Sequence, residues 1–183
     1  QWNLNVKKKW NHSPMSPERM IAEIAKGLPS DAIIADDAVT TSLPLHNTIP
    51  FNTPGSVFIS RGGALGWGIG GAMGLKLANP DHPVIAIVGD GSAMMTIQGL
   101  WTAANYNIPV VYIICNNQNY RILKLNMNAY KSQIMSDISP TSRYIGMEFP
   151  LPLNIAGIAK AQGIHARRIE DPNQICPLLD EAL

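Results

Sequence analysis

The chain has 183 residues and a nearly balanced charge, with 14 Lys+Arg against 13 Asp+Glu and a formal net charge of +1. This balance offers no electrostatic attraction to nucleic acid or to an anionic membrane, so we expect neither as a partner. Hydrophobic residues make up 46% of the chain, which suffices for one buried core, and no apolar run reaches the roughly 20 residues of a membrane helix. We therefore expect a globular, cytoplasmic protein.

The first 16 residues are polar and include three consecutive lysines at positions 7–9, so they are predicted to form a linker from a preceding domain. The chain begins with Gln1 rather than Met, and we therefore expect it to be a piece of a larger polypeptide, with one domain at residues 17–183. Cys115 and Cys176 lack the spacing of a metal or redox motif and are predicted to be core thiols.

Helical and strand patterns alternate after the linker. A helix is predicted from Pro17, after the capping residue Ser16, to Gly27. A glycine- and alanine-rich helix is expected after residue 61, and another helix at residues 94–106, where Met94, Trp101 and Tyr106 are expected to pack into the core. Four short apolar runs have the β-branched content of buried strands: residues 32–35, 56–60, 84–88 and 110–115.

Residues 118–153 show no regular pattern, which is typical of a functional or mobile segment. Beyond them we predict a helix at residues 155–162, a strand at residues 165–169 and a final helix after Asp171. The strand, helix and strand within residues 84–115 form a crossover unit, which makes its two strands parallel. The predicted fold is therefore α/β, a three-layer αβα arrangement of a mostly parallel sheet with helices on both faces.

Polar residues follow two of the predicted strands. Asp90 comes after the third strand and Asn117 after the fourth, and parallel strands bring these ends to the edge of the sheet where ligands bind. One carboxylate and one amide oxygen suit Mg²⁺ or Ca²⁺. Gly89 and Gly91 permit a sharp turn whose free amides can point at phosphate oxygens, and Ser92 adds a hydroxyl. Together these residues predict a Mg²⁺-diphosphate site.

The segment Gly89-Asp90-Gly91, 24 intervening residues and the pair Asn116-Asn117 resemble the diphosphate-binding motif of thiamine diphosphate enzymes. The chain resembles the cofactor-diphosphate domain of the acetolactate synthase and benzoylformate decarboxylase group, with the latter nearer. This resemblance implies that residues 17–183 are a thiamine diphosphate-binding domain of a multidomain enzyme. It extends over residues 52–56, 62–66, 100–109 and 116–120.

The resemblance also implies roles for single residues. Asp90, the side chain of Asn117 and the main-chain carbonyl of Asn119 would hold Mg²⁺. Gly63 and Leu65 would lie against the cofactor rings, with Leu65 as an apolar wedge that bends the cofactor. The full set of expected cofactor-binding residues is Thr40, Gly63, Leu65, Gly89, Gly91, Ser92, Asn117, Asn119 and Tyr120.

The activity implied by the resemblance is Mg²⁺-dependent decarboxylation of a small 2-oxo acid, with acetolactate synthase-like carboligation as the alternative. The activating glutamate of the family belongs to another domain, contributed by a second subunit. No catalytic residue is therefore assigned here, residues 1–183 alone are expected to be inactive, and the intact enzyme is expected to be a homodimer or homotetramer. Polar Asn126 falls where an aryl-lining side chain is expected, which disfavours benzoylformate itself as substrate.

Two other functions remain open at this point. Residues 66–71 match the GxGxxG pattern of NAD- or FAD-binding Rossmann domains, and Asp90 lies at the end of the following strand. Against that function, five residues separate Gly66 from the preceding strand, whereas the first glycine of the fingerprint should follow its strand directly. A non-catalytic family member that serves as an assembly or regulatory module is the second alternative.

Overall fold

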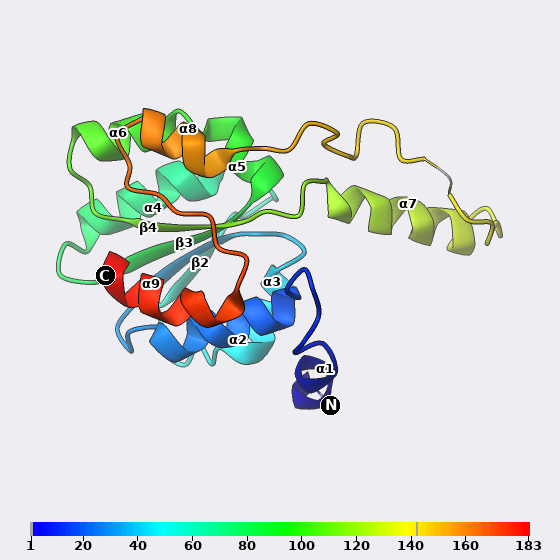
Figure 1. Ribbon diagram of the computed structural model, residues 1–183, viewed down its shortest axis with the longest axis horizontal. Helices are drawn as coiled ribbons and strands as arrows, with labels where there is room; N and C mark the ends of the chain where they lie inside the picture. Colours follow the sequence, from blue (N-terminus) through cyan, green and yellow to red (C-terminus); the bar gives the residue numbers. More distant parts are fainter. Residues whose placement is uncertain (1, 142) are drawn as a thin grey trace.

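The computed structural model describes residues 2–141 and 143–183, and its centre is a parallel sheet of four strands (Figure 1). The strands are β1 (Ile33–Asp37), β2 (Val57–Ile59), β3 (Val84–Gly89) and β4 (Val111–Cys115), in the spatial order β2-β1-β3-β4. All three strand pairs are parallel. The predicted α/β fold with a parallel sheet is thus confirmed.

Apolar side chains of the central strands fill both faces of the sheet, because successive residues of a strand point to opposite sides. On one face Ile34, Ile85 and Ile87 join a core cluster with α2 (Pro17–Gly27), α3 (Ser42–Thr48) and α9 (Ile175–Ala182). On the other face Ala35, Ala86 and Val88 pack against α4 (Trp67–Ala78), α6 (Gly99–Asn105) and α8 (Ile155–Ala161). Figure 1 shows these helices above and below the sheet. The layers are therefore αβα.

Helix α2 begins where the sequence predicts. The hydroxyl of Ser16 accepts a hydrogen bond of 3.2 Å from the backbone N–H of Arg19, and Pro17 occupies the first helical position. Such a cap contributes about 1 kcal/mol to stability. The helix buries Ile21 and Ile24 against the sheet.

The helix predicted at residues 94–106 is two helices, α5 (Asp90–Thr96) and α6, separated by a short turn. Gly99 begins α6 close to α4, where a Cβ atom would lie 2.9 Å from Cγ2 of Ile69. The predicted core packing of three apolar residues is wrong. They are exposed on the surface: Met94, Trp101 and Tyr106.

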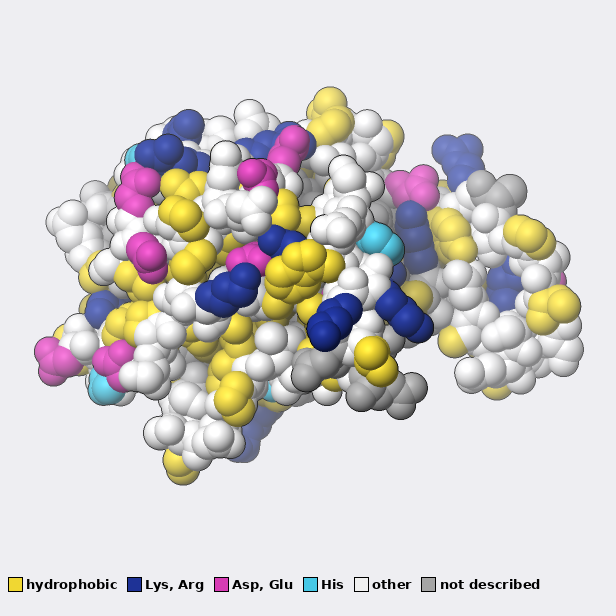
Figure 2. Space-filling view, turned by 60° about the horizontal axis from the view of Figure 1, so that its bottom comes forward, with side chains coloured by type: hydrophobic (Ala, Val, Ile, Leu, Met, Phe, Trp, Pro, Cys, Tyr) yellow, Lys and Arg dark blue, Asp and Glu magenta, His cyan; other side chains and the backbone are white. Residues whose placement is uncertain are grey.

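Residues 118–153 contain α7 (Arg121–Gln133), although no helix was predicted there. No residue of α7 is buried, and the helix projects from the sheet in Figure 1 and stands apart from the main body in Figure 2. Its apolar residues Leu123, Met127 and Tyr130 follow the helical spacing i, i+4 and i+7. The sequence therefore carried a helical signal here, and the prediction that the whole segment lacks a regular pattern is wrong at α7.

The strand predicted at residues 165–169 is not formed: the segment has no regular secondary structure and pairs with none of the four strands of the sheet. Ile164 and Ala166 pack against the core on one face of the sheet, and Ile169 packs against the core on the other. The apolar residues thus reflect packing without a strand ladder. The segment leads into the short 3₁₀ helix η1 (Pro172–Gln174) and then α9.

The segment predicted to be a linker includes the helix α1 (Trp2–Lys8) and is attached to α2 and α3. The indole N–H of Trp2 donates to the hydroxyl of Thr48 at 3.0 Å. The guanidinium of Arg19 lies 3.6 Å from the centre of the Trp10 ring, a cation–π contact. None of the helices described is long and apolar enough to cross a membrane.

Candidate functional site

The carboxyl ends of all four strands meet at one edge of the sheet, and the predicted site residues follow them. Thr40 follows β1, Gly63 and Leu65 follow β2, Asp90 follows β3, and Asn117 follows β4. The strand order reverses between β1 and β3, since β2 lies beyond β1 and β4 beyond β3. In open α/β sheets this reversal leaves a crevice in which ligands bind.

The structure joins the two halves of the predicted motif through the carboxylate of Asp90, which is 2% exposed. Its Oδ1 accepts from the N–H of Gly91 at 2.8 Å, and its Oδ2 accepts from the N–H of Gln118 at 2.5 Å. Gly89 pairs with Cys115 in the sheet, so the loops after β3 and β4 leave the sheet side by side. The predicted convergence of Asp90 with the loop that carries Asn117 is confirmed.

Burial raises the pKa of the Asp90 carboxyl, and the neighbouring amides of Gly91, Gln118 and Asn117 offset part of that rise. None of the ion pairs within residues 2–141 and 143–183 involves Asp90. A buried carboxylate without a positive partner is costly, so a bound cation would stabilise its ionised form.

Asn117 and Asn119 shape the loop after β4. The side-chain oxygen of Asn117 accepts from the N–H of Asn119 at 3.0 Å, and the Asn119 amide donates to the main-chain oxygen of Asn117 at 2.6 Å. Gln118 between them has a φ of +55°, in the left-handed region. An amide oxygen has two lone pairs, so the oxygen of Asn117 retains the capacity to bind a cation.

No cluster of three or more His, Cys, Asp and Glu side chains that could hold a metal occurs among the residues described. A metal at this edge would instead use one carboxylate together with amide and carbonyl oxygens. Such a set of hard oxygen donors fits Mg²⁺, which completes its coordination with water and phosphate oxygens, and does not fit zinc.

Tyr120 lies directly over Gly91. A Cβ atom on Gly91 would be 2.4 Å from Cε1 of Tyr120, so this contact requires glycine. The Tyr120 ring packs edge-on against Phe149, with ring centroids 4.8 Å apart. Phe149 was not predicted as a site residue, because it lies 29 positions further along the chain and no sequence pattern links the two rings. Beside them lies an apolar cavity of about 380 Å³, lined by Met94, Tyr120, Glu148, Phe149, Pro150, Leu151 and Leu153.

Ser92 is buried and its hydroxyl is already bonded within the protein. It donates to Oδ2 of Asp37 at 2.6 Å and accepts from the N–H of Gly66 at 2.7 Å. The hydroxyl hydrogen of Ser92 is therefore already donated within the chain, so only the backbone N–H of Ser92 remains to donate to a phosphate. Sequence reasoning missed Asp37, whose one signal is its place at the end of a buried strand.

The loops after β1 and β2 supply the remaining predicted residues. Thr40 is half-buried and follows Val39, which has a φ of +47°. Gly63 has a φ of +70°, a conformation that favours glycine, and no atom lies within 4 Å of its Cβ position. Leu65 is 40% exposed, so its side chain is free to contact a ligand.

The structure does not support the Rossmann alternative. The N–H groups of Gly66 and Gly68 both donate to Oδ2 of Asp37, each at 3.1 Å. These amides begin α4, where a dinucleotide pyrophosphate would have to bind, so the chain's own carboxylate occupies that position. The GxGxxG pattern therefore has an internal structural role.

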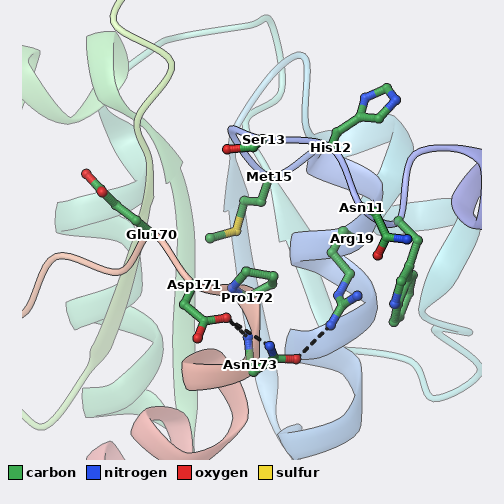
Figure 3. Close-up of a pocket in the computed structure, with 10 residues that line it drawn as sticks. Asn11, His12, Ser13, Met15, Arg19, Glu170, Asp171, Pro172 and Asn173 are labelled. Atoms are coloured by element: carbon green, nitrogen blue, oxygen red, sulfur yellow. Dashed lines mark hydrogen bonds between the residues drawn. The ribbon is translucent and has the colours of Figure 1, made fainter.

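A second pocket, of about 460 Å³, lies between residues 10–15, α2 and η1 (Figure 3). Its buried Arg19 donates to Oδ1 of Asn173 at 2.9 Å, contacts Glu23 and stacks on Trp10. None of the predicted cofactor- or metal-binding residues lines this pocket. Its arginine is engaged in holding the N-terminal segment against α2.

Residues 37–183 match the family model described as thiamine pyrophosphate enzyme, C-terminal TPP binding domain; TPP is another name for thiamine diphosphate. The chain is 39% identical over 111 residues to benzoylformate decarboxylase of Pseudomonas aeruginosa, a match that covers 61% of the chain and 21% of that protein. It is 27% identical over 186 residues to acetolactate synthase isozyme 3 large subunit of Escherichia coli, covering 100% of the chain and 31% of that protein.

The fold is also shared with solved structures. Thiamine diphosphate-dependent 4-hydroxybenzoylformate decarboxylase of Rhodococcus jostii RHA1 matches with a TM-score of 0.82 and 30% sequence identity. That match covers 93% of the chain and 31% of the solved chain. The chain thus spans between about a fifth and a third of the length of these proteins.

Proposed function

Because this chain belongs to the thiamine pyrophosphate enzymes, as their C-terminal TPP-binding domain, we propose that it binds thiamine diphosphate through Mg²⁺. The observation that carries this proposal is the buried carboxylate of Asp90. It lies at the reversal point of the sheet, is bonded to the loop after β4, and has no positively charged partner among the residues described.

The proposed metal ligands are the carboxylate of Asp90, the side-chain oxygen of Asn117 and the main-chain carbonyl of Asn119. All three are hard oxygen donors, as Mg²⁺ requires. Asp90 is fixed in place for this role, because β3 ends at Gly89 and the buried first turn of α5 begins with Asp90.

The proposed diphosphate contacts are the backbone at Gly91, the backbone amide of Ser92 and the loop at Thr40. The N–H of Gly91 itself donates to Oδ1 of Asp90, so it is not a free phosphate donor as the sequence predicted. Gly63 and Leu65 would contact the rings of the cofactor, and Tyr120 closes the site over Gly91. When bound, thiamine diphosphate supplies the electron sink for breaking the C–C bond next to a 2-oxo group. The residues of this chain bind and orient the cofactor and exclude water from the buried carboxylate.

We further propose that residues 17–183 act as one domain of a larger cytoplasmic enzyme that decarboxylates a 2-oxo acid, with residues 1–16 as the link to a preceding domain. The benzoylformate and 4-hydroxybenzoylformate decarboxylases among the similar proteins support this reaction. Carboligation is the second candidate, because the match to an acetolactate synthase subunit covers the whole chain. Asn126 was expected to disfavour benzoylformate, but it is exposed on the projecting α7 and lines neither of the two cavities described above, so it gives no reason to exclude an aryl substrate.

The proposed enzyme assembles as a homodimer or homotetramer, in which another domain of a second subunit supplies the activating glutamate. Residues 1–183 alone are then inactive. The test compares this chain with the full-length protein on a panel of 2-oxo acids, with release of CO₂ and formation of acetohydroxy acids as separate readouts. Turnover by the isolated chain would contradict the proposal, and the ratio of the two products would decide between decarboxylation and carboligation.

The metal site is tested by calorimetric titration of the full-length protein with thiamine diphosphate. We expect binding to require Mg²⁺, to be lost in EDTA, and to weaken by about 100-fold or more in Asp90→Ala, which corresponds to about 2.8 kcal/mol. Asp81→Ala is the matched control, because Asp81 is an exposed acid that precedes β3 at the opposite edge of the sheet. Metal-independent binding, or equal affinity of Asp90→Ala and Asp81→Ala, would contradict the assignment.

A further inference from the structure

Asp37 is a buried carboxylate that the proposed function does not use. It ends β1 and is 5% exposed. Its Oδ2 atom accepts three hydrogen bonds: from the hydroxyl of Ser92 at 2.6 Å and from the N–H groups of Gly66 and Gly68 at 3.1 Å each. A single oxygen atom therefore joins the start of α4 to the first turn of α5.

Gly66 is held to α5 by further bonds. Its N–H also reaches the oxygen of Ser92 at 2.7 Å, and its carbonyl accepts from the hydroxyl of Thr96 at 2.6 Å. Gly66 has a φ of +87°, and a Cβ atom there would lie 3.0 Å from Cβ of Met95. Both polar groups of this peptide are therefore bonded to side chains of α5.

Gly68 is required by the close approach of Asp37 itself. A Cβ atom on Gly68 would lie 2.7 Å from Cβ of Asp37 and 3.1 Å from Cγ2 of Val88. The pair of glycines at positions 66 and 68 thus lets the chain wrap around its own carboxylate. This accounts for the glycine pattern that resembles a dinucleotide fingerprint.

We propose that Asp37 is a positioning residue that fixes the segment with Gly63 and Leu65 relative to the segment with Asp90 and Gly91. The inference rests on the proposed function, in which the first segment contacts the cofactor rings and the second the metal-diphosphate. Leu65 directly precedes Gly66, and Gly91 directly precedes Ser92. The Asp37 bonds therefore act one residue from each end of the cofactor site.

A positioning role for Asp37 predicts unequal effects on two ligands, whereas a purely stabilising role predicts equal effects. Thiamine diphosphate spans both segments, so its affinity depends on their spacing, and a site that is already ordered binds more tightly. Inorganic pyrophosphate with Mg²⁺ does not reach the first segment, because its proposed contacts are the metal ligands, the segment with Asp90 and Gly91, and the loop at Thr40. Loss of Asp37 should therefore weaken the binding of thiamine diphosphate much more than that of pyrophosphate.

The experiment titrates the full-length protein with each of the two ligands in the presence of Mg²⁺. For Asp37→Ala we expect the affinity for thiamine diphosphate to fall by about tenfold or more, and that for pyrophosphate by less than about threefold. Asp37→Asn keeps one acceptor oxygen and should recover most of the affinity for thiamine diphosphate. Thr96→Val is a second variant for the case in which Asp37→Ala does not fold. It removes the hydrogen bond from the Thr96 hydroxyl to the Gly66 carbonyl and leaves every buried carboxylate in place. It should also weaken the binding of thiamine diphosphate more than that of pyrophosphate.

Asp36→Ala is the matched control. Asp36 neighbours Asp37 on β1 and is equally buried, at 4% exposure, but its carboxylate bonds to Ala38, Ser42 and His46 and to no residue of α4 or α5. It should lower thermal stability while leaving the ratio of the two affinities unchanged. The inference is overturned if Asp37→Ala weakens both ligands equally, or if Asp36→Ala shifts the ratio as strongly. A wild-type protein that binds no thiamine diphosphate would overturn the proposed function and this inference with it.

Discussion

Replacing Gly68 by alanine tests whether the start of α4 is as tightly packed around Asp37 as the structure shows. The new Cβ atom would lie 2.7 Å from Cβ of Asp37, with Oδ2 of Asp37 and Cγ2 of Val88 each at 3.1 Å. The first contact is with a side-chain atom attached directly to the backbone of β1, which cannot rotate away. The helix or the strand must shift, and the hydrogen bond from Gly68 to Asp37 must lengthen.

The expected cost follows from three opposing contributions. Overpacking costs about 1–3 kcal/mol. The weakened bond to a carboxylate costs up to about 1.5 kcal/mol more. Alanine gains at most about 1 kcal/mol over glycine from helix propensity. We therefore expect Gly68→Ala to lower the free energy of unfolding by about 2 kcal/mol.

Gly70→Ala is the matched control, because Gly70 lies in the same helix, is exposed, and has no atom within 4 Å of its Cβ position. It should raise the free energy of unfolding by up to about 1 kcal/mol. The assay is urea denaturation of the 183-residue chain, followed by far-ultraviolet circular dichroism. If Gly68→Ala stabilises the chain as much as Gly70→Ala does, the close packing of α4 on Asp37 is refuted.

Two further predictions concern buried ionisable groups. Burial raises the pKa of Asp37, so its ionised form costs stability above the folded-state pKa, and the cost fades as the pH falls toward the unfolded-state value. In urea denaturation, the free energy of unfolding of Asp37→Asn minus that of the wild type should therefore increase from about pH 4 to about pH 7. A difference that does not change with pH would contradict this. Burial also raises the pKa of the Cys115 thiol to about 12, whereas Cys176 is only half-buried and both thiols are free. Iodoacetamide should therefore label Cys176 first in the native chain, as read by mass spectrometry of its peptides, and equal labelling would show that Cys115 is accessible.

The sequence alone determined the parallel α/β fold, because short apolar runs separated by helical segments leave few other ways to cover both faces of a sheet. It also placed Asp90 near the loop of Asn117. That inference needs no knowledge of side-chain contacts, since parallel strands must end at the same edge of the sheet. The start of α2 was equally predictable, because Ser16 caps the helix through a neighbour three positions away.

Only the tertiary structure decided the features that depend on segments far apart in the chain. Asp37 meets Gly66 and Ser92 across 29 and 55 positions, and no local pattern records that contact. Residues 165–169, with the sequence His-Ala-Arg-Arg-Ile, were predicted to be a strand but gain no partner strand, because pairing depends on what lies beside the segment. The exposure of Trp101 and of α7 also depends on distant segments. The sequence shows which side chains are apolar and how they are spaced, but only the packing of the other elements determines whether they are covered.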